Sequence, residues 1–107
     1  MSETLRRVLE LVKDQEVKIS VHGYDEMAED GMMVRESLKG VSDVVIVEDY
    51  SEYPTGPCVL VLQKDREDRP VHVVSGIPKR ASSPAVVVTA YRPDPKLWSS
   101  DFMRRNP

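Results

Sequence analysis

The run AVVVTAYRPDPKLWSSDFMRR, residues Ala85 to Arg105, joins a strand-forming segment to a cationic and aromatic tail. Its three consecutive valines, Val86 to Val88, are β-branched and apolar, which is typical of a buried strand. The following residues, Tyr91 to Pro95, include two prolines and an aspartate, the residue types that form turns. The sequence therefore predicts a buried strand followed by a tail that could dock a polar or anionic partner.

Within this tail, the two aromatic residues Trp98 and Phe102 are spaced at i and i+4. This spacing fits a terminal helix that begins near Ser99 or Ser100, with both rings on one side. We expect the rings to clasp the tail onto the sheet. An exposed aromatic pair that contacts bases or a partner is the alternative.

The part of the chain from Asp43 to Tyr91 consists of β-forming segments. Four valine-rich segments of strand length are separated by the turn-rich runs YPTGP, KDREDRP and PKRASSP. The segment DRED is a polar hairpin tip, so we expect the second and third strands to be neighbours. Four strands linked by turns predict an antiparallel meander built from Asp43–Tyr50, Cys58–Gln63, Val71–Gly76 and Ala85–Tyr91.

The first part of the chain has helical periodicity instead. One apolar stripe at i, i+3, i+4 and i+7 comprises Leu5, Val8, Leu9 and Val12, and Ser2 or Thr4 is placed to cap the helix. A short extended piece follows at Lys18 to Ser20. The run HGYDEMAEDG, which ends at Gly31, predicts a second short helix, and Val34 to Lys39 predicts a third.

Helices first and strands afterwards indicate an α+β fold. We expect N-terminal helices packed on one face of a four-stranded, mainly antiparallel sheet, with a short C-terminal helix or tail. The length of 107 residues indicates a single domain, residues 1–107.

Composition narrows the class of protein. No apolar run approaches the roughly 20 residues that a membrane helix needs, and Met1 to Glu16 is too charged for a secretory signal. We therefore expect a cytoplasmic protein without a membrane partner. The only cysteine, Cys58, lies in the strand-like CVLVL, and a buried thiol explains it better than a nucleophile does.

Charge is distributed unevenly along the chain. Residues 1–53 carry six Lys and Arg against thirteen Asp and Glu, a net charge of −7, whereas residues 54–107 carry nine against five, a net charge of +4. Four alternative explanations fit this distribution: solvated surface charge, two oppositely charged faces on one domain, a self-complementary oligomer, or an anion site in the second half.

A first candidate site is the series His22, Glu26 and Asp30, which share roughly one face of a continuous helix. An imidazole and carboxylates so placed could bind a metal or form an acid–base pair. No HExxH or paired CxxC accompanies them, and acidic residues on a short helix are usually solvated, so we predict no metal site. Without GxGxxG, GxxxxGK[ST] or GxSxG, the sequence predicts no cofactor either.

A second candidate is His72, in the strand-like PVHVV, where it shares a strand face with Val74. A satisfied, partly buried histidine is a better explanation there than a catalytic one. Tyr91 and Thr89 share a face of the last strand, and either would meet His72 if the third and fourth strands pair in a suitable register. The sequence does not specify that register.

The segments SVHGYDEMAEDGM, EDY, VHVV and VTAYRPDPKLWSSDFMRR, in this order, resemble the small bacterial and archaeal family called domain of unknown function 4258. That family is in turn thought to be similar to RelE-type and BrnT-type toxins. Those toxins are metal-independent ribonucleases of toxin–antitoxin modules, with helices packed on an antiparallel sheet.

The resemblance implies roles for individual residues. It implies a catalytic set made of His22, His72 and Tyr91, and phosphate binding by Arg92, Arg104 and Arg105. Pro93, Asp94 and Trp98 match the rest of the family's closing motif. Where the family's helix often has basic residues, in a pattern like HAxxRMxERG, this chain has Glu26 and Asp30. Two carboxylates at those positions would repel RNA phosphates.

Two main classes of function therefore stay open, beside an unrelated small-molecule role. In the first, the chain is an active metal-independent endoribonuclease of a toxin–antitoxin module. In the second, which we favour, the chain has kept the fold and lost efficient catalysis, and serves in protein interaction or weak RNA binding. The corresponding partners are RNA, an antitoxin-like protein or a second copy of the chain.

Overall fold

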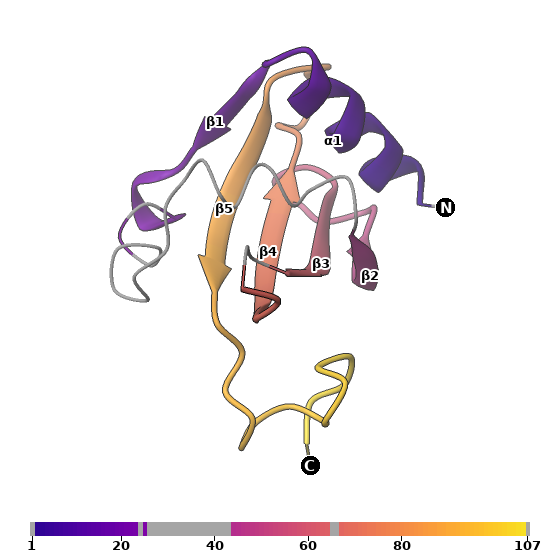
Figure 1. Cartoon of the computed structure of the whole chain (residues 1–107). Helices are drawn as coiled ribbons and strands as arrows, with labels where there is room; N and C mark the ends of the chain where they lie inside the picture. The colour runs from indigo at the N-terminus through magenta and orange to yellow at the C-terminus, as the bar shows by residue number, and fades with distance from the viewer. Residues whose placement is uncertain (1, 24, 26–43, 65–66, 107) are drawn as a thin grey trace.

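The protein is an α+β domain, seen here in a computed structural model that describes residues 2–23, 25, 44–64 and 67–106 (Figure 1). One helix and five strands follow each other along the described chain: α1 (Glu3–Lys13), β1 (Val17–Ile19), β2 (Val45–Tyr50), β3 (Cys58–Lys64), β4 (Pro70–Gly76) and β5 (Ala85–Tyr91). A short helical turn at residues 21–23 follows β1. The expected α+β class is thus confirmed.

The five strands form one mixed sheet in the order β1-β5-β4-β3-β2. Strands β2 to β5 are antiparallel neighbours in chain order, which is the expected meander, and β3 and β4 are paired as the DRED hairpin indicated. The prediction of four strands is wrong, because β1 adds a fifth at the edge and runs parallel to β5.

The sequence indicated an extended piece at Lys18 to Ser20 but did not show that it joins the sheet as β1, for two physical reasons. The strand has three residues, too few for an alternation of apolar and polar side chains to be recognised. Its partner is also remote, since the neighbouring bond from the Ser20 hydroxyl to the Val88 carbonyl oxygen spans 68 positions in the sequence. Parallel strands are not joined by a tight turn, so no turn residues in the sequence indicate this pairing.

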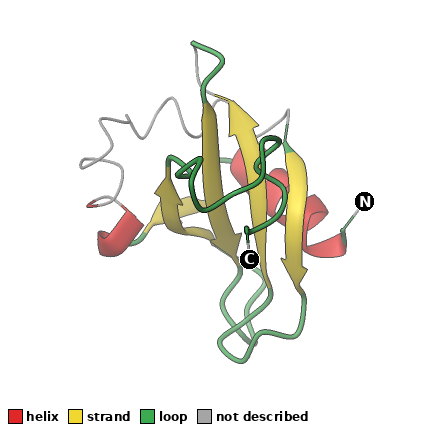
Figure 2. Cartoon of the chain, turned by 90° about the horizontal axis from the view of Figure 1, so that it is seen from below, coloured by secondary structure: helices red, strands yellow, loops and turns green. Residues whose placement is uncertain are grey.

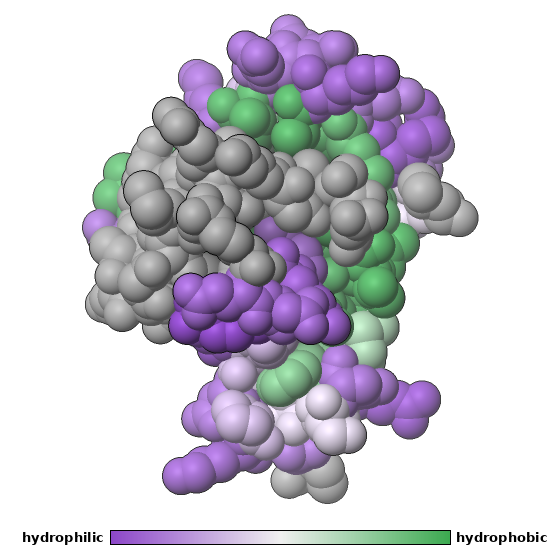
Figure 3. Space-filling model, viewed as in Figure 1, coloured by the Kyte–Doolittle hydropathy of each residue, from purple (hydrophilic) through white to green (hydrophobic). Residues whose placement is uncertain are grey.

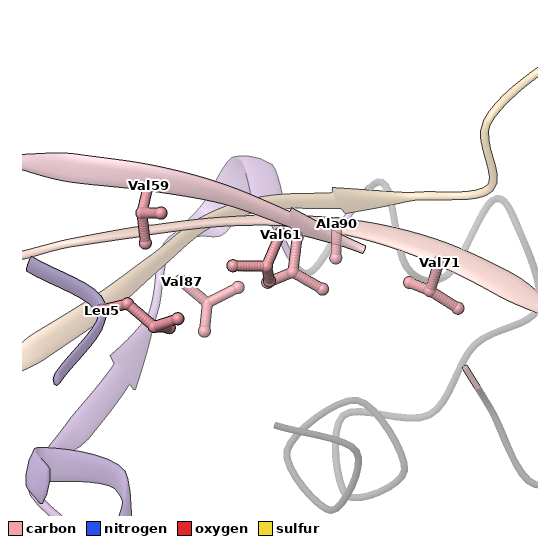
Figure 4. Packing of buried hydrophobic residues seen from close by; sticks show 7 residues of the cluster. Leu5, Val59, Val61, Val71, Val87 and Ala90 are labelled. Carbon is pink, nitrogen blue, oxygen red and sulfur yellow. The ribbon is translucent and has the colours of Figure 1, made fainter. Parts of the chain in front are cut away.

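Helix α1 packs on one face of the sheet, as its apolar stripe predicted. Ser2 caps it by accepting a hydrogen bond from the Leu5 amide at 3.1 Å. The buried Leu5 contacts a valine-rich cluster from the three central strands: Val59, Val61, Val71, Val73, Val87 and Ala90. Figure 4 shows these strand side chains directed to the side where Leu5 lies. Burial of this cluster holds α1 against β3, β4 and β5.

The opposite sheet face, which we call the tail face, carries the alternate side chains of the same strands. Because Val71 and Val73 point toward α1, His72 and Val74 point away from it. The tail, residues 92–106, covers the end of this face where β5 stops, and in Figure 2 it passes in front of the strands while α1 lies behind them. The tail face is therefore where the candidate residues gather.

The C-terminal segment is a tail folded into a small hairpin, so of the two expected forms, a short helix or a tail, the helix is wrong. Trp98 and Arg105 form an antiparallel bridge, the Ser99 amide donates to the Arg104 carbonyl oxygen at 2.8 Å, and the Asn106 amide donates to the Leu97 carbonyl oxygen at 2.9 Å. Between the two arms the chain turns through Phe102, whose φ of 61° lies in the left-handed region. That conformation is incompatible with a continuing right-handed helix.

Some expectations fall outside the described residues, namely most of the second helix with Glu26 and Asp30, and the third helix at Val34 to Lys39. Among the residues that are described, none belongs to a helix long and apolar enough to cross a membrane.

Candidate functional site

His72 lies in the middle of β4 with 0% of its surface exposed, and it is the largest fully buried side chain in the described part of the protein. Its ring meets Tyr91 edge-on at a centroid distance of 5.4 Å, because the β4–β5 register places His72 directly opposite Tyr91. The Trp98 indole covers it from the tail at 4.4 Å, also edge-on. Trp98 is itself 6% exposed, so the expected clasp of Trp98 onto the sheet is confirmed.

Both nitrogens of the His72 ring are engaged. Nε2 lies 2.9 Å from the Phe102 carbonyl oxygen, and Nδ1 lies 3.2 Å from the Tyr91 hydroxyl. A carbonyl oxygen can only accept, so Nε2 must carry the proton, and in a neutral ring Nδ1 then accepts from the Tyr91 hydroxyl. The environment thus specifies one tautomer and leaves no ring nitrogen directed to solvent.

The electrostatics favour the neutral ring. Burial lowers the pKa of His72 below its ordinary value; the hydrogen bond to Phe102 acts in the opposite direction, and the nearby Arg105 charge lowers the pKa further. A buried, neutral imidazole with both nitrogens bonded is suited to holding the tail on the sheet.

Local hydrogen bonds give the tail hairpin its shape. The Asp101 carboxylate accepts from the Ser99 hydroxyl at 2.6 Å and from the Met103 amide at 3.1 Å, and the Ser99 hydroxyl accepts from the Arg104 amide at 3.1 Å. The Ser99 hydrogen bond is the first cause that lowers the pKa of Asp101. These bonds close the turn that places Arg104 and Arg105 on the second arm.

The two arginines of this arm are exposed. The Arg105 guanidinium carbon lies 5.3 Å from the centre of the Trp98 ring, within the range of a cation–π contact. In Figure 3 the tail, at the bottom of the molecule, shows mostly hydrophilic and intermediate colours. Arg92, the third arginine of the predicted phosphate site, is half-buried just after β5 and is not part of the hairpin arm that carries this exposed pair.

His22 stands apart from the His72 cluster. It is exposed in the helical turn after β1, at the edge of the sheet. Ser20 at the start of that turn bonds to Val87 and Val88, three to four positions before Tyr91 on β5. The structure therefore brings His72, Tyr91 and Arg105 together and places His22 at a different level of the sheet. Metal ligands do not gather either, since no cluster of three or more His, Cys, Asp or Glu suited to a metal occurs among the described residues.

A cavity of about 570 Å³ opens in another part of the tail face. It lies where β2 and β4 end and β3 and β5 begin, and its described lining is mainly apolar: Tyr50, Tyr53, Thr55, Gly56, Pro57, Cys58, Val74, Gly76, Ile77, Pro78, Val86 and Val88. Gly56 and Ile77 both line the cavity and lie close together: φ at Gly56 is 132°, and a Cβ there would overlap the Ile77 carbonyl oxygen. Burial is the first cause that raises the pKa of Cys58, with Asp49 second, so its thiol is a poor nucleophile.

Sequence reasoning missed the Phe102 carbonyl and the cavity. A backbone acceptor has no side-chain signature, and the cavity is assembled from loops whose packing the strand pattern does not encode. The pair Tyr50 and Tyr53 in EDYSEYPTGP was the one available signal, since two aromatic residues beside a turn are a common feature of binding surfaces.

Comparisons with known proteins show the family to which the chain belongs. The family model described as "Domain of unknown function (DUF4258)" matches residues 19–92, more than half of the chain, so the protein belongs to this family. A search of curated proteins found no match. A search of solved structures found none either.

Proposed function

We propose that this domain binds single-stranded RNA through its docked tail and does not cleave the RNA efficiently. The observation that carries the proposal is the tail hairpin, which holds two exposed arginines, Arg104 and Arg105, on one arm. Neutralising backbone phosphates with such cations releases counterions and supplies sequence-independent affinity. Prior folding of the hairpin reduces the entropy that binding would otherwise lose.

The engagement of His72 argues against efficient catalysis. A general base must come within hydrogen-bond reach of the proton it removes. The His72 nitrogens are occupied by Phe102 and Tyr91, and Trp98 covers the ring. With the tail docked, an RNA 2′-hydroxyl has no route to this imidazole.

The active ribonuclease remains the second candidate, and one observation favours it. The 3.2 Å contact between His72 and Tyr91 pairs an imidazole with a phenol, two groups suited to proton transfer. This pair would become accessible if the tail lifted. The similarity of the family to RelE-type and BrnT-type toxins stays a prediction from the sequence.

Salt-dependent binding of a short, labelled, single-stranded RNA tests the proposal. We expect the affinity of the wild-type chain to fall steeply with salt concentration. The double variant Arg104→Glu and Arg105→Glu should lose binding, because it replaces two cations that contact phosphate with two anions. Each lost phosphate contact also lowers the slope of log affinity against log salt concentration by about 0.7 for single strands. Fluorescence anisotropy between about 50 and 200 mM salt measures both quantities.

The matched control is Arg7→Glu with Lys13→Glu on α1, which makes the same change in net charge on the opposite sheet face. An equal loss in both double variants would mean that overall charge, not the tail, governs binding. Absence of RNA binding by the wild-type chain would reject the proposal and leave the protein-interaction alternative, with an antitoxin-like protein or a second copy as partner.

A Trp98→Ala variant tests the second candidate. If the tail conceals a competent site, undocking it should produce metal-independent cleavage of the RNA, which a gel assay detects. Our proposal expects intact RNA from this variant as well as from the wild-type chain.

A further inference from the structure

We propose that the cavity beside Tyr50 and Tyr53 receives one unstacked base of the RNA strand whose phosphates contact the tail. This inference rests on the proposed function and adds a second, base-binding element to it. The ligand chemistry is a planar heteroaromatic ring, carried either by a strand or by a free nucleotide, and we assign it to the strand.

The size and lining of the cavity fit such a ring. A volume of about 570 Å³ lies within the roughly 300–1,000 Å³ typical of small-ligand pockets. Val74, Val86 and Val88 supply apolar surface, and Val88 is 42% exposed, so part of this surface is in contact with water. Covering this surface with a base removes it from water.

Two aromatic rings stand at the cavity. Tyr50 and Tyr53 meet edge-to-face, with centroids 6.2 Å apart and planes inclined by 62°. Tyr53 is 53% exposed, so one of its faces is available to a ligand without disturbing the core. Stacking on aromatic side chains is the general means by which proteins hold single-stranded bases, and it tolerates any base.

Two opposite charges act on Tyr50, the Glu48 carboxylate and the Arg105 guanidinium, and they favour different parts of a nucleotide. The Tyr50 hydroxyl donates to the exposed Glu48 carboxylate; this bond, with burial, raises the pKa of Tyr50 to about 12, and the Arg105 charge opposes the rise. Arg105 of the tail therefore lies within electrostatic reach of a residue that lines the cavity. Glu48 repels phosphate at this wall and can accept a hydrogen bond from the amino group of a base.

A pair of valine substitutions tests the inference. Val88→Phe fills the cavity, whereas Val45→Phe makes the same change on β2 at a residue that is 53% exposed and does not line it. We expect Val88→Phe to weaken binding of the RNA oligonucleotide by about 5- to 100-fold with an unchanged salt slope. Val45→Phe should bind as the wild type does. Melting temperatures confirm that both variants fold, and Tyr53→Ala, in an exposed loop, gives a second way to remove the stacking surface.

The outcomes separate this inference from the proposed function. Salt-dependent RNA binding that Val88→Phe and Tyr53→Ala leave unchanged would overturn the base pocket and keep the tail. No RNA binding at all would remove both. An oligonucleotide without bases should bind the wild-type chain weakly and be insensitive to Val88→Phe. A nucleoside monophosphate that binds as tightly as the oligonucleotide would overturn the strand as the source of the base.

Discussion

At the scale of single residues, His72 and Trp98 connect the sheet to the tail. The imidazole gives one hydrogen bond to the tail backbone and takes one from the Tyr91 side chain, and the indole closes over it. An unbonded polar group at this depth would cost about 1–3 kcal/mol, so the two bonds are what permit a histidine in the interior. The same bonds determine how stability depends on pH and on the indole.

Acidification should destabilise the protein through His72. Its pKa is lowered in the folded state, so the unfolded chain binds more protons as the pH falls below the ordinary value near 6.5. The contribution of His72 is therefore complete above pH 6.5 and is lost as the pH falls through the folded-state pKa. Denaturant unfolding between pH 7.5 and 5 measures the loss, and a His22→Gln background leaves His72 as the sole histidine.

The comparison chain for this experiment is His72→Gln in the same background, which retains only the pH dependence of the carboxylates. If the unfolding free energies of the two chains differ by the same amount at every pH, His72 does not contribute as described.

Removing the indole should destabilise the protein by more than any other change in the tail. We expect Trp98→Ala to lower the free energy of unfolding by about 3–5 kcal/mol, the usual cost of truncating a buried Trp. Leu97→Ala, one position earlier and 62% exposed, should change it by less than about 0.5 kcal/mol. Chemical denaturation measures both values, and equal effects would mean that the indole is not packed on His72.

At the level of elements, one side-chain hydroxyl adds to the backbone pairing that joins β1 to β5. Ser20 Oγ donates to the Val88 carbonyl oxygen at 2.7 Å and accepts from the Gly23 amide at 3.0 Å, so it ties the end of β1 and the following helical turn to β5. The position combines the role of a helix cap with that of a cross-strand link.

Ser20→Ala should therefore cost about 1 kcal/mol and speed amide hydrogen exchange in the turn that contains His22. Ser20→Thr, which keeps the hydroxyl, is the matched control. Unchanged exchange at Gly23 in Ser20→Ala would contradict this assignment.

The elements also explain what sequence patterns could anticipate. Valine-rich runs bounded by turn residues located β2 to β5 to within two residues at each end, because burial and turn chemistry agree there. In the tail, the helical spacing of Trp98 and Phe102 suggested a helix that does not form. The local hydrogen bonds of Ser99 and Asp101 favour a turn there instead. Side-chain to backbone bonds of this type compete directly with helix formation.

The candidate site was foreseen in part for the same reason. The sequence offered Tyr91 or Thr89 as a partner for His72 without choosing between them. The choice is made by the register of β4 against β5, which pairs His72 with Tyr91 and shifts between Val74 and Ser75. A register shift of this kind depends on how the sheet closes and has no local sequence signal.

At the scale of the whole molecule, the tail face has two unlike regions. The end where β5 stops presents the cations of the tail, and the region where β5 begins presents an apolar cavity with two tyrosines. The charge difference between the two halves of the sequence, −7 against +4, is partly accounted for by this arrangement, since Arg104 and Arg105 of the basic half extend over the sheet. The proposed RNA binding without cleavage requires a tail that stays docked on the sheet, because a tail that lifts freely would expose the His72 and Tyr91 pair.

The protonation state of the His72 imidazole shows whether the tail is held on the sheet. Nitrogen-15 NMR at pH 7.5 reports which ring nitrogen carries the proton and how fast that proton exchanges with water. We expect a single neutral tautomer protonated at Nε2, slow exchange of that proton, and nuclear Overhauser contacts from the ring to the Trp98 indole. A rapidly exchanging ring that averages both tautomers and lacks indole contacts would contradict the account, because the tail would then be free of the sheet and the imidazole open to a substrate.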